Sequence, residues 1–199
     1  MNFGVPVWDS LSYTFLCFAG LSVAEYVSRK KWKIILLSAL FVMILDIIVD
    51  PLAHLGDKWF LGKIYYYPHP GWYFNVPVSN FVGWFFVAAL IIGLNLLVEG
   101  VARLKGAPHR AQQFGARWGM KLRQDPFYQI ISHSGLFLYF GIFLFNLGIT
   151  IWIQEWKLVI LDLLWISVPL VLVLRKLKRN VESRCRENPS EPVPDAPRG

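Results

Sequence analysis

Long apolar runs alternate along the chain with short polar segments, and the lengths of the runs predict the architecture. An α-helix needs roughly 20 mostly apolar residues to cross a bilayer. Five runs come close to this length, and they cover residues 8–27, 32–49, 78–98, 127–149 and 153–174. The pattern therefore predicts an all-α fold: a polytopic membrane helix bundle with about five transmembrane helices, forming a single domain over residues 1–179.

Composition agrees with a membrane protein and excludes a single soluble domain. Of the 199 residues, 55% are hydrophobic and 16% are aromatic, which is too apolar for a soluble chain of this length. The net charge of +7 raises the question of a nucleic-acid partner. The basic residues, however, stand just outside the apolar runs rather than along one soluble face. We therefore expect membrane lipids, and no nucleic acid, around this chain.

The basic residues also predict how the chain is oriented in the cell membrane. Cytoplasmic segments of membrane proteins carry an excess of lysine and arginine. Basic clusters follow the first, third and fifth runs, and they contain Arg29, Lys30, Lys31 and Lys33, then Arg103, Lys105, Arg110, Arg117, Lys121 and Arg123, then Arg175, Lys176, Lys178 and Arg179. We therefore expect a multi-pass protein with its N-terminus outside and its C-terminus in the cytoplasm. Residues 180–199 are proline-rich and charged, which predicts a disordered cytoplasmic tail.

The segment between the second and third runs is crowded with aromatic residues and broken by prolines. It is too broken for one helix and too apolar for a solvated loop, so it predicts an interfacial re-entrant segment. An aromatic belt at the lipid headgroups would explain any single tryptophan or tyrosine here. Their density beside two carboxyl groups instead favours a substrate cavity. Its expected lining is Trp59, Tyr65, Tyr66, Trp72 and Tyr73, with Asn80 and Trp84 from the third run.

Asp46 is the first candidate for catalysis because it stands inside an apolar run. It lies about four helical turns after the start of the second run, in the outer half of the hydrocarbon. Burying an aspartate there costs about 3 kcal/mol, so such a residue usually faces the bundle interior and has a functional or pairing role. The alternative is a structural hydrogen bond to Asn80 or Asn146 that fixes helix packing.

Asp50 is ambiguous because Pro51 follows it. A residue before proline is pushed out of helical geometry, so Asp50 could cap a new short helix that begins at Pro51. If the second run stays helical through Asp50, residues four apart lie on one face, with about 5 to 6 Å between their Cβ atoms. Two carboxyl groups that close in a poorly solvated site cannot both ionise easily, so Asp46 and Asp50 would supply one acid and one base.

The string from Asp46 to Trp84 carries a family resemblance. Its features are Asp46, Asp50-Pro51, the aromatic loop with Tyr65-Tyr66 and Gly71-Trp72-Tyr73, and then NVPVSNFVGW from Asn75 to Trp84. This string resembles the carotenoid biosynthesis membrane-protein family that includes the bisanhydrobacterioruberin and γ-carotene hydratases. Family members usually show a tighter Tyr-Tyr-Gly-Val-Pro run before Ser-Asn-Phe-x-Gly-Trp. This chain has extra residues there, and it has Asn75 where glycine is more typical.

The resemblance implies a carbon–oxygen lyase of the hydratase type, which adds water to the terminal C=C bond of a linear carotenoid or polyprenyl chain. It implies no cofactor, and its partners would be the isoprenoid substrate and, for a pathway member, other carotenoid enzymes. The chemistry of the residues agrees with this. A neutral carboxylic acid can protonate an alkene, and aromatic faces within about 6 Å stabilise the resulting cation. A second carboxylate can then act as base for the water.

Two other functions stay open at this stage. Asp46-x-x-x-Asp50 resembles half of the acidic motif by which magnesium-dependent membrane prenyltransferases hold a diphosphate, although the sequence shows no second acidic motif. A non-catalytic carotenoid-binding membrane scaffold would use the aromatic residues but would not need the two acids. Substitution of Asp46 and Asp50 therefore separates the scaffold from both enzymes.

Three further polar residues are weaker candidates. His54 continues the spacing of the two aspartates, and with His69 it could bind a metal. The two histidines lack a recognised ligand spacing, so we expect no metal. Asn146 could pair with Asp46 across the bundle. Asp162 lies near the middle of the fifth run, and an acid inside the membrane is a candidate site residue by default.

Overall fold

The computed structural model describes residues 7–58, 67, 69–104 and 126–187. Its elements are α1 (Val7–Val27), α2 (Lys31–Ala53), the short 3₁₀ helix η1 (Gly56–Lys58), α3 (Val78–Leu104), α5 (Pro126–Trp152) and α6 (Trp156–Glu187). These described residues contain no β-strand. By length and composition, α2, α3, α5 and α6 could each cross a membrane. The predicted polytopic helical membrane protein is therefore confirmed.

The apolar runs predict the middles of the helices better than their ends. Residues 153–155, which the fifth run places in a helix, form the turn between α5 and α6 instead. Gln154 adopts a left-handed φ of 62° there. Its N–H donates to the Ile151 carbonyl, and the Glu155 N–H donates to the Thr150 carbonyl. These two bonds satisfy carbonyl groups in the last turn of α5 and end the helix.

α6 continues past the boundary at which the sequence predicts a disordered tail. The helix runs to Glu187, because its last three turns contain neither proline nor glycine and consist mostly of good helix formers. Lys178 and Glu182 add an ion pair one turn apart, with 4.0 Å between Nζ and Oε1. The bundle therefore ends in a helical extension, and the predicted tail from residue 188 onward lies outside the described residues.

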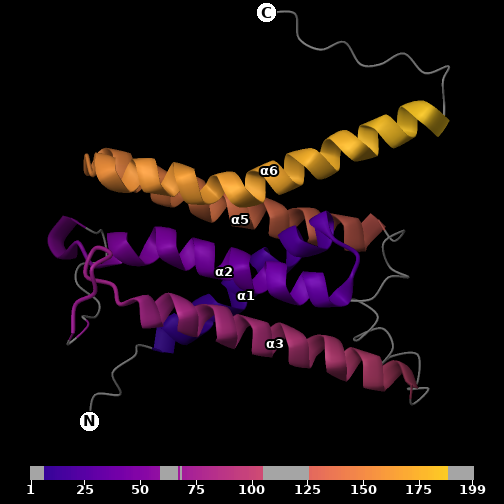
Figure 1. Ribbon diagram of the computed structural model, residues 1–199, viewed down its shortest axis with the longest axis horizontal. Coiled ribbons are helices and arrows are strands. Elements are labelled where there is room, and N and C mark those ends of the chain that lie inside the picture. Colours follow the sequence, from indigo (N-terminus) through magenta and orange to yellow (C-terminus); the bar gives the residue numbers. More distant parts are fainter. Residues whose placement is uncertain (1–6, 59–66, 68, 105–125, 188–199) are drawn as a thin grey trace, which may run out of the picture.

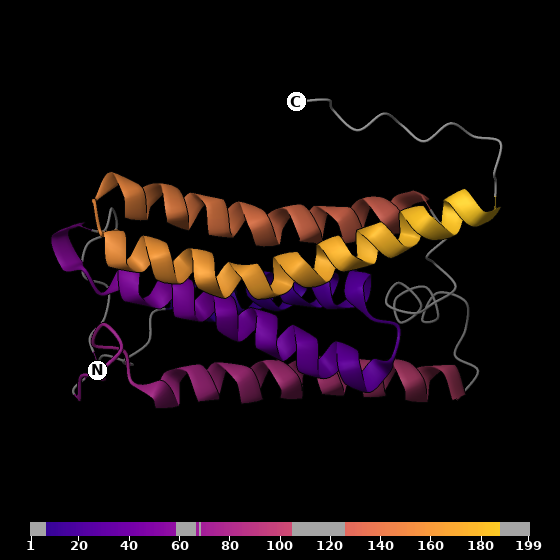
Figure 2. The ribbon, with the colours of Figure 1, turned by 45° about the horizontal axis from the view of Figure 1, so that its top comes forward.

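α2 is the centre of the bundle and contacts α1, α3, α5 and α6. Figure 1 shows α3 on one side of α2 and the α5–α6 pair on the other, and Figure 2 shows the same order from a second direction. The core includes the fully buried side chains of Phe41, Ile44 and Leu45 from α2 and Tyr139 from α5. Because neighbours cover α2 on several sides, polar residues on more than one of its faces are buried.

The described parts of the connection between α2 and α3 lie at the same end of the bundle as the α5–α6 turn (Figure 1). Lys58 of η1 and Glu155 of the α5–α6 turn join these segments through an ion pair, with 2.5 Å between Nζ and Oε1. The turn between α1 and α2, which contains the basic residues Arg29 and Lys30, lies at the opposite end. The described part of the aromatic segment, residues 67 and 69–77, thus lies at the end of the bundle away from this basic turn.

Candidate functional site

α2 stays helical through Asp50 and Pro51 and ends at Ala53, so the alternative in which Pro51 begins a new helix is wrong. Proline lacks an N–H, and its position in the last turn removes only the helical bond to the Ile47 carbonyl. The residues from Asp50 to Ala53 are buried, and their packing offsets that loss. The continuous helix places Asp46 and Asp50 one turn apart on the same face.

Asn80 joins the two acids. It stands in the first turn of α3, and its Nδ2 donates to Oδ2 of Asp46 over 2.9 Å and to Oδ2 of Asp50 over 3.1 Å. An amide NH₂ group carries two hydrogens, one for each carboxyl group. Only 5% of Asp46 and 4% of Asp50 is exposed, so the amide holds the acids together away from water. The structural hydrogen bond considered for Asp46 exists, and it serves both acids.

Tyr67 supplies a further hydrogen bond from the connection between α2 and α3. Its hydroxyl donates to the same Oδ2 atom of Asp50 over 3.0 Å. His54 lies one turn after Asp50 at the end of α2, and its ring packs on the Tyr67 ring with 4.9 Å between the centroids. His54 therefore belongs to the surroundings of the acid pair through Tyr67.

Residues 71–76 form a tight hairpin at this end of α2. The Gly71 N–H donates to the Asn75 carbonyl over 3.2 Å, and a Cβ atom at Gly71 would lie only 2.1 Å from the Val76 carbonyl oxygen. Phe74 and Asn75 turn the chain with left-handed φ angles of 48° and 67°. Asparagine adopts this conformation more readily than most residues. Asn75 therefore fills a position that glycine would also fit.

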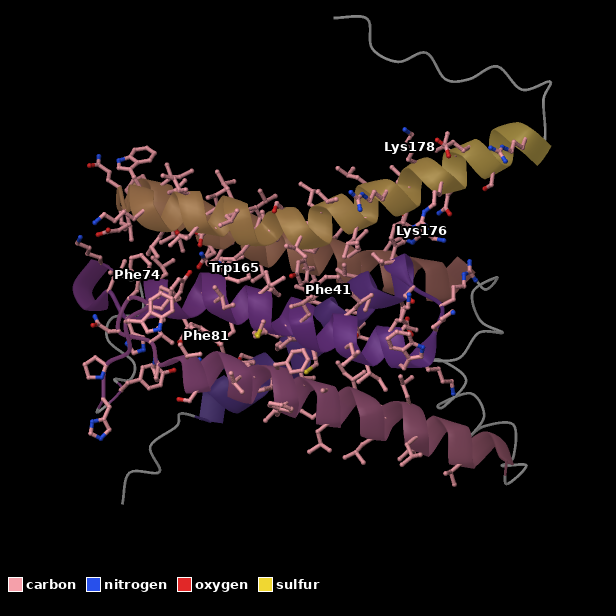
Figure 3. The ribbon with its side chains drawn as sticks, viewed as in Figure 1. Phe41, Phe74, Phe81, Trp165, Lys176 and Lys178 are labelled. Carbon is pink, nitrogen blue, oxygen red and sulfur yellow. The ribbon has the colours of Figure 1, made fainter. Side chains whose placement is uncertain are left out.

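The hairpin brings aromatic rings against the helices next to the acid pair. Three buried side chains and the rings that pack on them gather here, namely Ile47, Val76, Phe81, Tyr67, Tyr73 and Trp165. Tyr73 meets Phe81 edge to face, with 5.5 Å between the ring centroids. Figure 3 labels Phe74, Phe81 and Trp165 at this end of the bundle. Because Tyr67 belongs to this group and its hydroxyl donates to Asp50, these rings lie beside the acid pair.

Tyr73 contributes an uncharged ring and hydroxyl group. Its pKa is raised to about 12, chiefly because partial burial would remove water from the phenolate. A hydrogen bond from Trp165 lowers the pKa, and the negative charge of Asp162 raises it. The hydroxyl group of Tyr73 is therefore neutral at physiological pH, and the hairpin reaches α6 through this side chain.

Asn146 and Asp162 form a second buried cluster with Thr150, between α5 and α6. Nδ2 of Asn146 donates to the Ile48 carbonyl of α2 over 3.2 Å and lies 3.4 Å from Oδ2 of Asp162. The Thr150 hydroxyl lies 3.4 Å from the same Oδ2 atom. Residues two apart on a helix point to different sides, so the Ile48 carbonyl and the Asp46 side chain lie on different faces of α2. Of the two partners considered for Asp46, the structure brings Asn80 to it and places Asn146 against Asp162.

Two residues expected to line the cavity, Trp72 and Trp84, are not among the rings that pack around Ile47, Val76 and Phe81. Trp72 is 84% exposed, so it faces the surroundings of the protein and suits an interfacial belt better than a cavity wall. Trp84 stacks on Tyr13 of α1, with 3.8 Å between the ring centroids and 6° between the planes. Three other candidates lie outside the described residues, namely Trp59, Tyr65 and Tyr66.

The sequence-based candidates omit three residues of these two clusters: Tyr67, Thr150 and Trp165. Tyr67 is the third tyrosine in a row, and nothing in the run itself indicates which ring meets an acid. Thr150 follows Asn146 by four positions and Trp165 follows Asp162 by three. Both spacings put the pair on one helix face, and this signal could have identified them.

The acid pair can transfer protons inside an apolar site. Two carboxyl groups one helical turn apart, away from water, favour a state with a single proton on the pair. The protonated group is then a proton donor and the other a proton acceptor, and the neighbouring ring faces can stabilise a positive charge. Within the described ranges, no three His, Cys, Asp or Glu side chains gather in a way that could hold a metal ion.

Comparison with known proteins extends the resemblance seen in residues 46–84. The model of a family described as carotenoid biosynthesis protein matches residues 1–169. This match runs from α1 into α6 and includes the residues of both buried clusters. No curated protein matches the chain, and no solved structure matches it.

Proposed function

Since the chain belongs to the carotenoid biosynthesis protein family, we propose that it is a cofactor-independent hydratase that adds water to the terminal C=C bond of a linear carotenoid or related polyprenyl chain. The observation that carries this proposal is the buried pair Asp46 and Asp50, held by one amide of Asn80 beside a group of aromatic rings. Hydration of an alkene needs a proton donor, a site that tolerates a carbocation, and a proton acceptor for the water. This end of the bundle offers all three.

The reaction begins when the neutral carboxyl group gives its proton to the less substituted carbon of the double bond. The electron pair of the C=C bond forms the new C–H bond, and the more substituted carbon becomes a tertiary cation. The ring faces of Tyr67, Tyr73 and Trp165 are the candidates to stabilise this cation, because they pack together beside the acids. Such attraction between a cation and a ring is strongest where water is excluded.

Water then adds to the cation, and the second carboxylate accepts the proton that the water releases. We assign Asp50 as this acceptor, because its Oδ2 accepts hydrogen bonds from both Asn80 and the Tyr67 hydroxyl of the ring group. Asp46 is then the proton donor. The product is a tertiary alcohol, and proton transfer from Asp50 back to Asp46 restores the starting state.

The charge pattern supports an orientation for this reaction. The basic clusters favour an N-terminus outside the cell and a C-terminus in the cytoplasm. The acid pair then lies in the outer half of the membrane. A linear isoprenoid reaches it from the lipid, with its terminal double bond near the hairpin and its length along the acyl chains.

The experiment that tests this function is expression in hosts that accumulate lycopene or γ-carotene, grown in water enriched in heavy oxygen. We expect a product heavier than the substrate by one molecule of water, and the new oxygen atom should carry the label. A new oxygen atom that comes from molecular oxygen would contradict the hydratase mechanism. Unchanged pigments in both hosts, with the protein present in the membrane, would contradict the proposed substrates.

A further inference from the structure

A second polar cluster lies inside the bundle, and the hydratase mechanism uses none of its residues. It consists of Asp162 on α6 with Asn146 and Thr150 on α5, of which only 2%, 2% and 0% is exposed. Polar groups in such a place are costly unless they find hydrogen-bond partners. The hydrogen bonds within the cluster therefore decide what it can bind.

The amide group of Asn146 has a fixed orientation. Its Nδ2 lies 3.2 Å from the Ile48 carbonyl oxygen and 3.4 Å from Oδ2 of Asp162, and both neighbours are acceptors. Turning the amide over would place its oxygen against two other oxygens, so the NH₂ group stays on this side. The Oδ1 atom is thus held in place and buried, and it receives no hydrogen bond from any residue that the structure describes.

Asp162 has only long hydrogen bonds among the described groups. Asn146 Nδ2 and Thr150 Oγ1 both lie 3.4 Å from its Oδ2 atom, beyond the usual range of about 2.7 to 3.2 Å. The Thr150 hydroxyl has one hydrogen to donate, and the Asn146 backbone carbonyl is nearer to it, at 2.8 Å. Within the described part of the chain, Asn146 Oδ1 therefore lacks a donor, and the Asp162 carboxyl group has only the two long contacts.

We propose that Asn146, Thr150 and Asp162 form a binding site for a hydroxyl group, which donates its hydrogen to Asn146 Oδ1 or to the Asp162 carboxyl group. An anion such as a carboxylate or a phosphate would lie against the Asp162 carboxyl group and Asn146 Oδ1 and be repelled, because the two donors of the cluster already bond to backbone carbonyls. Two sources supply this chemistry: a water molecule, or the tertiary alcohol of a hydrated isoprenoid. The alcohol source rests on the proposed hydratase function, whereas the water source does not.

The position of the cluster suits either source. Trp165, which stands one turn after Asp162 on α6, packs in the same group as Tyr73 and Phe81 beside the acid pair. Tyr73 is also close enough to Asp162 to respond to its charge. Trp165 and Tyr73 thus connect the hydroxyl site with the ring group beside the acid pair, but the site contacts α2 at the Ile48 carbonyl.

Thermal unfolding of the full-length protein in lipid nanodiscs tests the alcohol source. The probes are dihydromyrcenol, a small isoprenoid with a terminal tertiary alcohol, and dihydromyrcene, the diene from which hydration makes it. Selective binding raises the melting temperature by mass action, so the alcohol should raise it more than the diene does. The difference should persist in Ser167→Ala, which removes a hydroxyl of α6 bonded to the Leu164 carbonyl.

Two variants remove the site in different ways. Asn146→Leu deletes the acceptor, and the preference for the alcohol should disappear. Asp162→Asn keeps the shape of the side chain and should fold normally, but it replaces one carboxyl oxygen with an NH₂ group that cannot accept from a hydroxyl group, so the preference should also be lost. The second variant keeps the test decisive if the first fails to fold.

Radiolytic hydroxyl labelling in heavy-oxygen water, without either probe, tests the water source. Water held at the site should label Trp165 rapidly, while the buried ring of Phe41 should stay unlabelled. The Trp165 label should decrease in Asp162→Asn.

Four outcomes are distinguishable. An alcohol preference that Asp162→Asn removes supports an alcohol site, and a Trp165 label without such a preference supports a water site. If neither signal appears, the groups of the cluster satisfy one another's hydrogen bonds, for example through a proton on Asp162, and the proposal is overturned. The fourth outcome is a melting temperature that is higher in a sodium salt than in a choline salt, with the difference absent in Asp162→Asn. This result would indicate a cation site and would also overturn the proposal. None of these measurements needs turnover, so a chain inactive on carotenoids would still give a clear result.

Discussion

Asn80 decides which chemistry is available to the two aspartates, because one amide group donates to both carboxyl groups. Two buried carboxyl groups this close repel one another when both are ionised, and a donor for each lowers the cost of keeping them together. Tyr67 adds a third donor, which reaches Asp50 alone. The two acids therefore have different surroundings although they lie on the same helix face. Single-residue substitutions can separate their roles.

The first prediction concerns the acids themselves. Asp46→Asn and Asp50→Asn should each reach the membrane at near wild-type levels and lose most turnover. Asparagine keeps the shape of aspartate and can still accept from Asn80, but it cannot exchange a proton as a carboxyl group does. Loss of general acid or base catalysis typically lowers a rate by about 10² to 10⁴. The yield of hydrated carotenoid per amount of protein measures this effect.

Glu155→Gln is the matched control for these variants. It makes the same change from acid to amide at the same end of the bundle, but in a surface ion pair with Lys58, and it should keep wild-type turnover. If Asp50→Asn keeps normal turnover and Asp46→Asn does not, Asp50 is only a structural partner of Asn80. Normal turnover in both acid variants would contradict the acid–base mechanism and favour a non-catalytic carotenoid-binding protein.

The second prediction concerns the shared amide. Asn80→Leu removes a donor from two buried carboxyl groups, and leaving a buried polar group unsatisfied costs about 1 to 3 kcal/mol. We expect the free energy of unfolding to fall by this order, and turnover to fall with it. Asn95→Leu makes the same change at an exposed position inside the membrane span of the same helix, where leucine suits the lipid at least as well as asparagine, so it should not lower the free energy of unfolding. Equal effects of the two variants in denaturant unfolding would contradict the role of Asn80.

At the scale of elements, the end of α2 and the hairpin of residues 71–76 together build the site. α2 supplies both acids because it continues through Pro51. The hairpin places Val76 and Tyr73 against that helix and against α3 and α6. The hairpin is held by close backbone contacts, so its shape depends on a few residues with special conformational needs. Gly71 and Asn75 are the clearest of these.

The third prediction is that Gly71→Ala should impair the site without a change in any acid. A methyl group at this position would lie 2.1 Å from the Val76 carbonyl oxygen, so the hairpin must open. Misplacement of a catalytic group by about 1 Å can cost about 10²-fold in rate, and carotenoid yield should fall by this order. Asn75→Gly should keep activity, because glycine also adopts the left-handed conformation.

Gly93→Ala on α3 is the control for the hairpin variant. A Cβ atom there meets no atom within 4 Å, and alanine is a better helix former than glycine by about 1 kcal/mol. We expect Gly93→Ala to keep turnover and to unfold at a slightly higher temperature. If Gly71→Ala behaves in the same way, the hairpin does not shape the site.

At the scale of the whole molecule, the bundle has two different ends and a central helix with two polar faces. Asp46 and Asp50 turn one face of α2 toward α3, while Ile48 offers its carbonyl to Asn146 of α5. The hairpin of residues 71–76 and the α5–α6 turn lie at one end, and the basic α1–α2 turn lies at the other (Figure 1). The orientation of the bundle therefore decides from which side of the membrane the site is reached.

The fourth prediction tests this orientation by cysteine labelling in a chain whose Cys17 and Cys185 are replaced by serine. Trp72→Cys, at an exposed hairpin position, should react with a membrane-impermeant maleimide in intact cells. Ser183→Cys, at an exposed position near the end of α6, should react only after the membrane is permeabilised. The reverse pattern would place the hairpin in the cytoplasm and overturn the proposed outer location of the site.

The sequence by itself determined the helices and the membrane setting. In lipid, the backbone finds hydrogen-bond partners only within a helix or a closed barrel, so the lengths of the apolar runs place helices reliably. The four-residue spacing of Asp46 and Asp50 likewise puts both acids on one face of any continuous helix. The positions of the helix ends depend instead on local backbone hydrogen bonds. Gln154 and Glu155 end α5 through backbone hydrogen bonds, which the hydrophobic pattern does not contain.

Only the tertiary structure decided which polar residues meet. Asn80 and Asn146 both stand in apolar helices, yet one reaches the acid pair and the other reaches Asp162. The rotation of α3 and α5 about their axes makes this choice, and the packing of many side chains sets that rotation. Tyr67 meets Asp50, although it is 17 positions away in the sequence. A sequence shows which polar residues exist, but their pairing depends on the packing free energy of segments far apart in the chain.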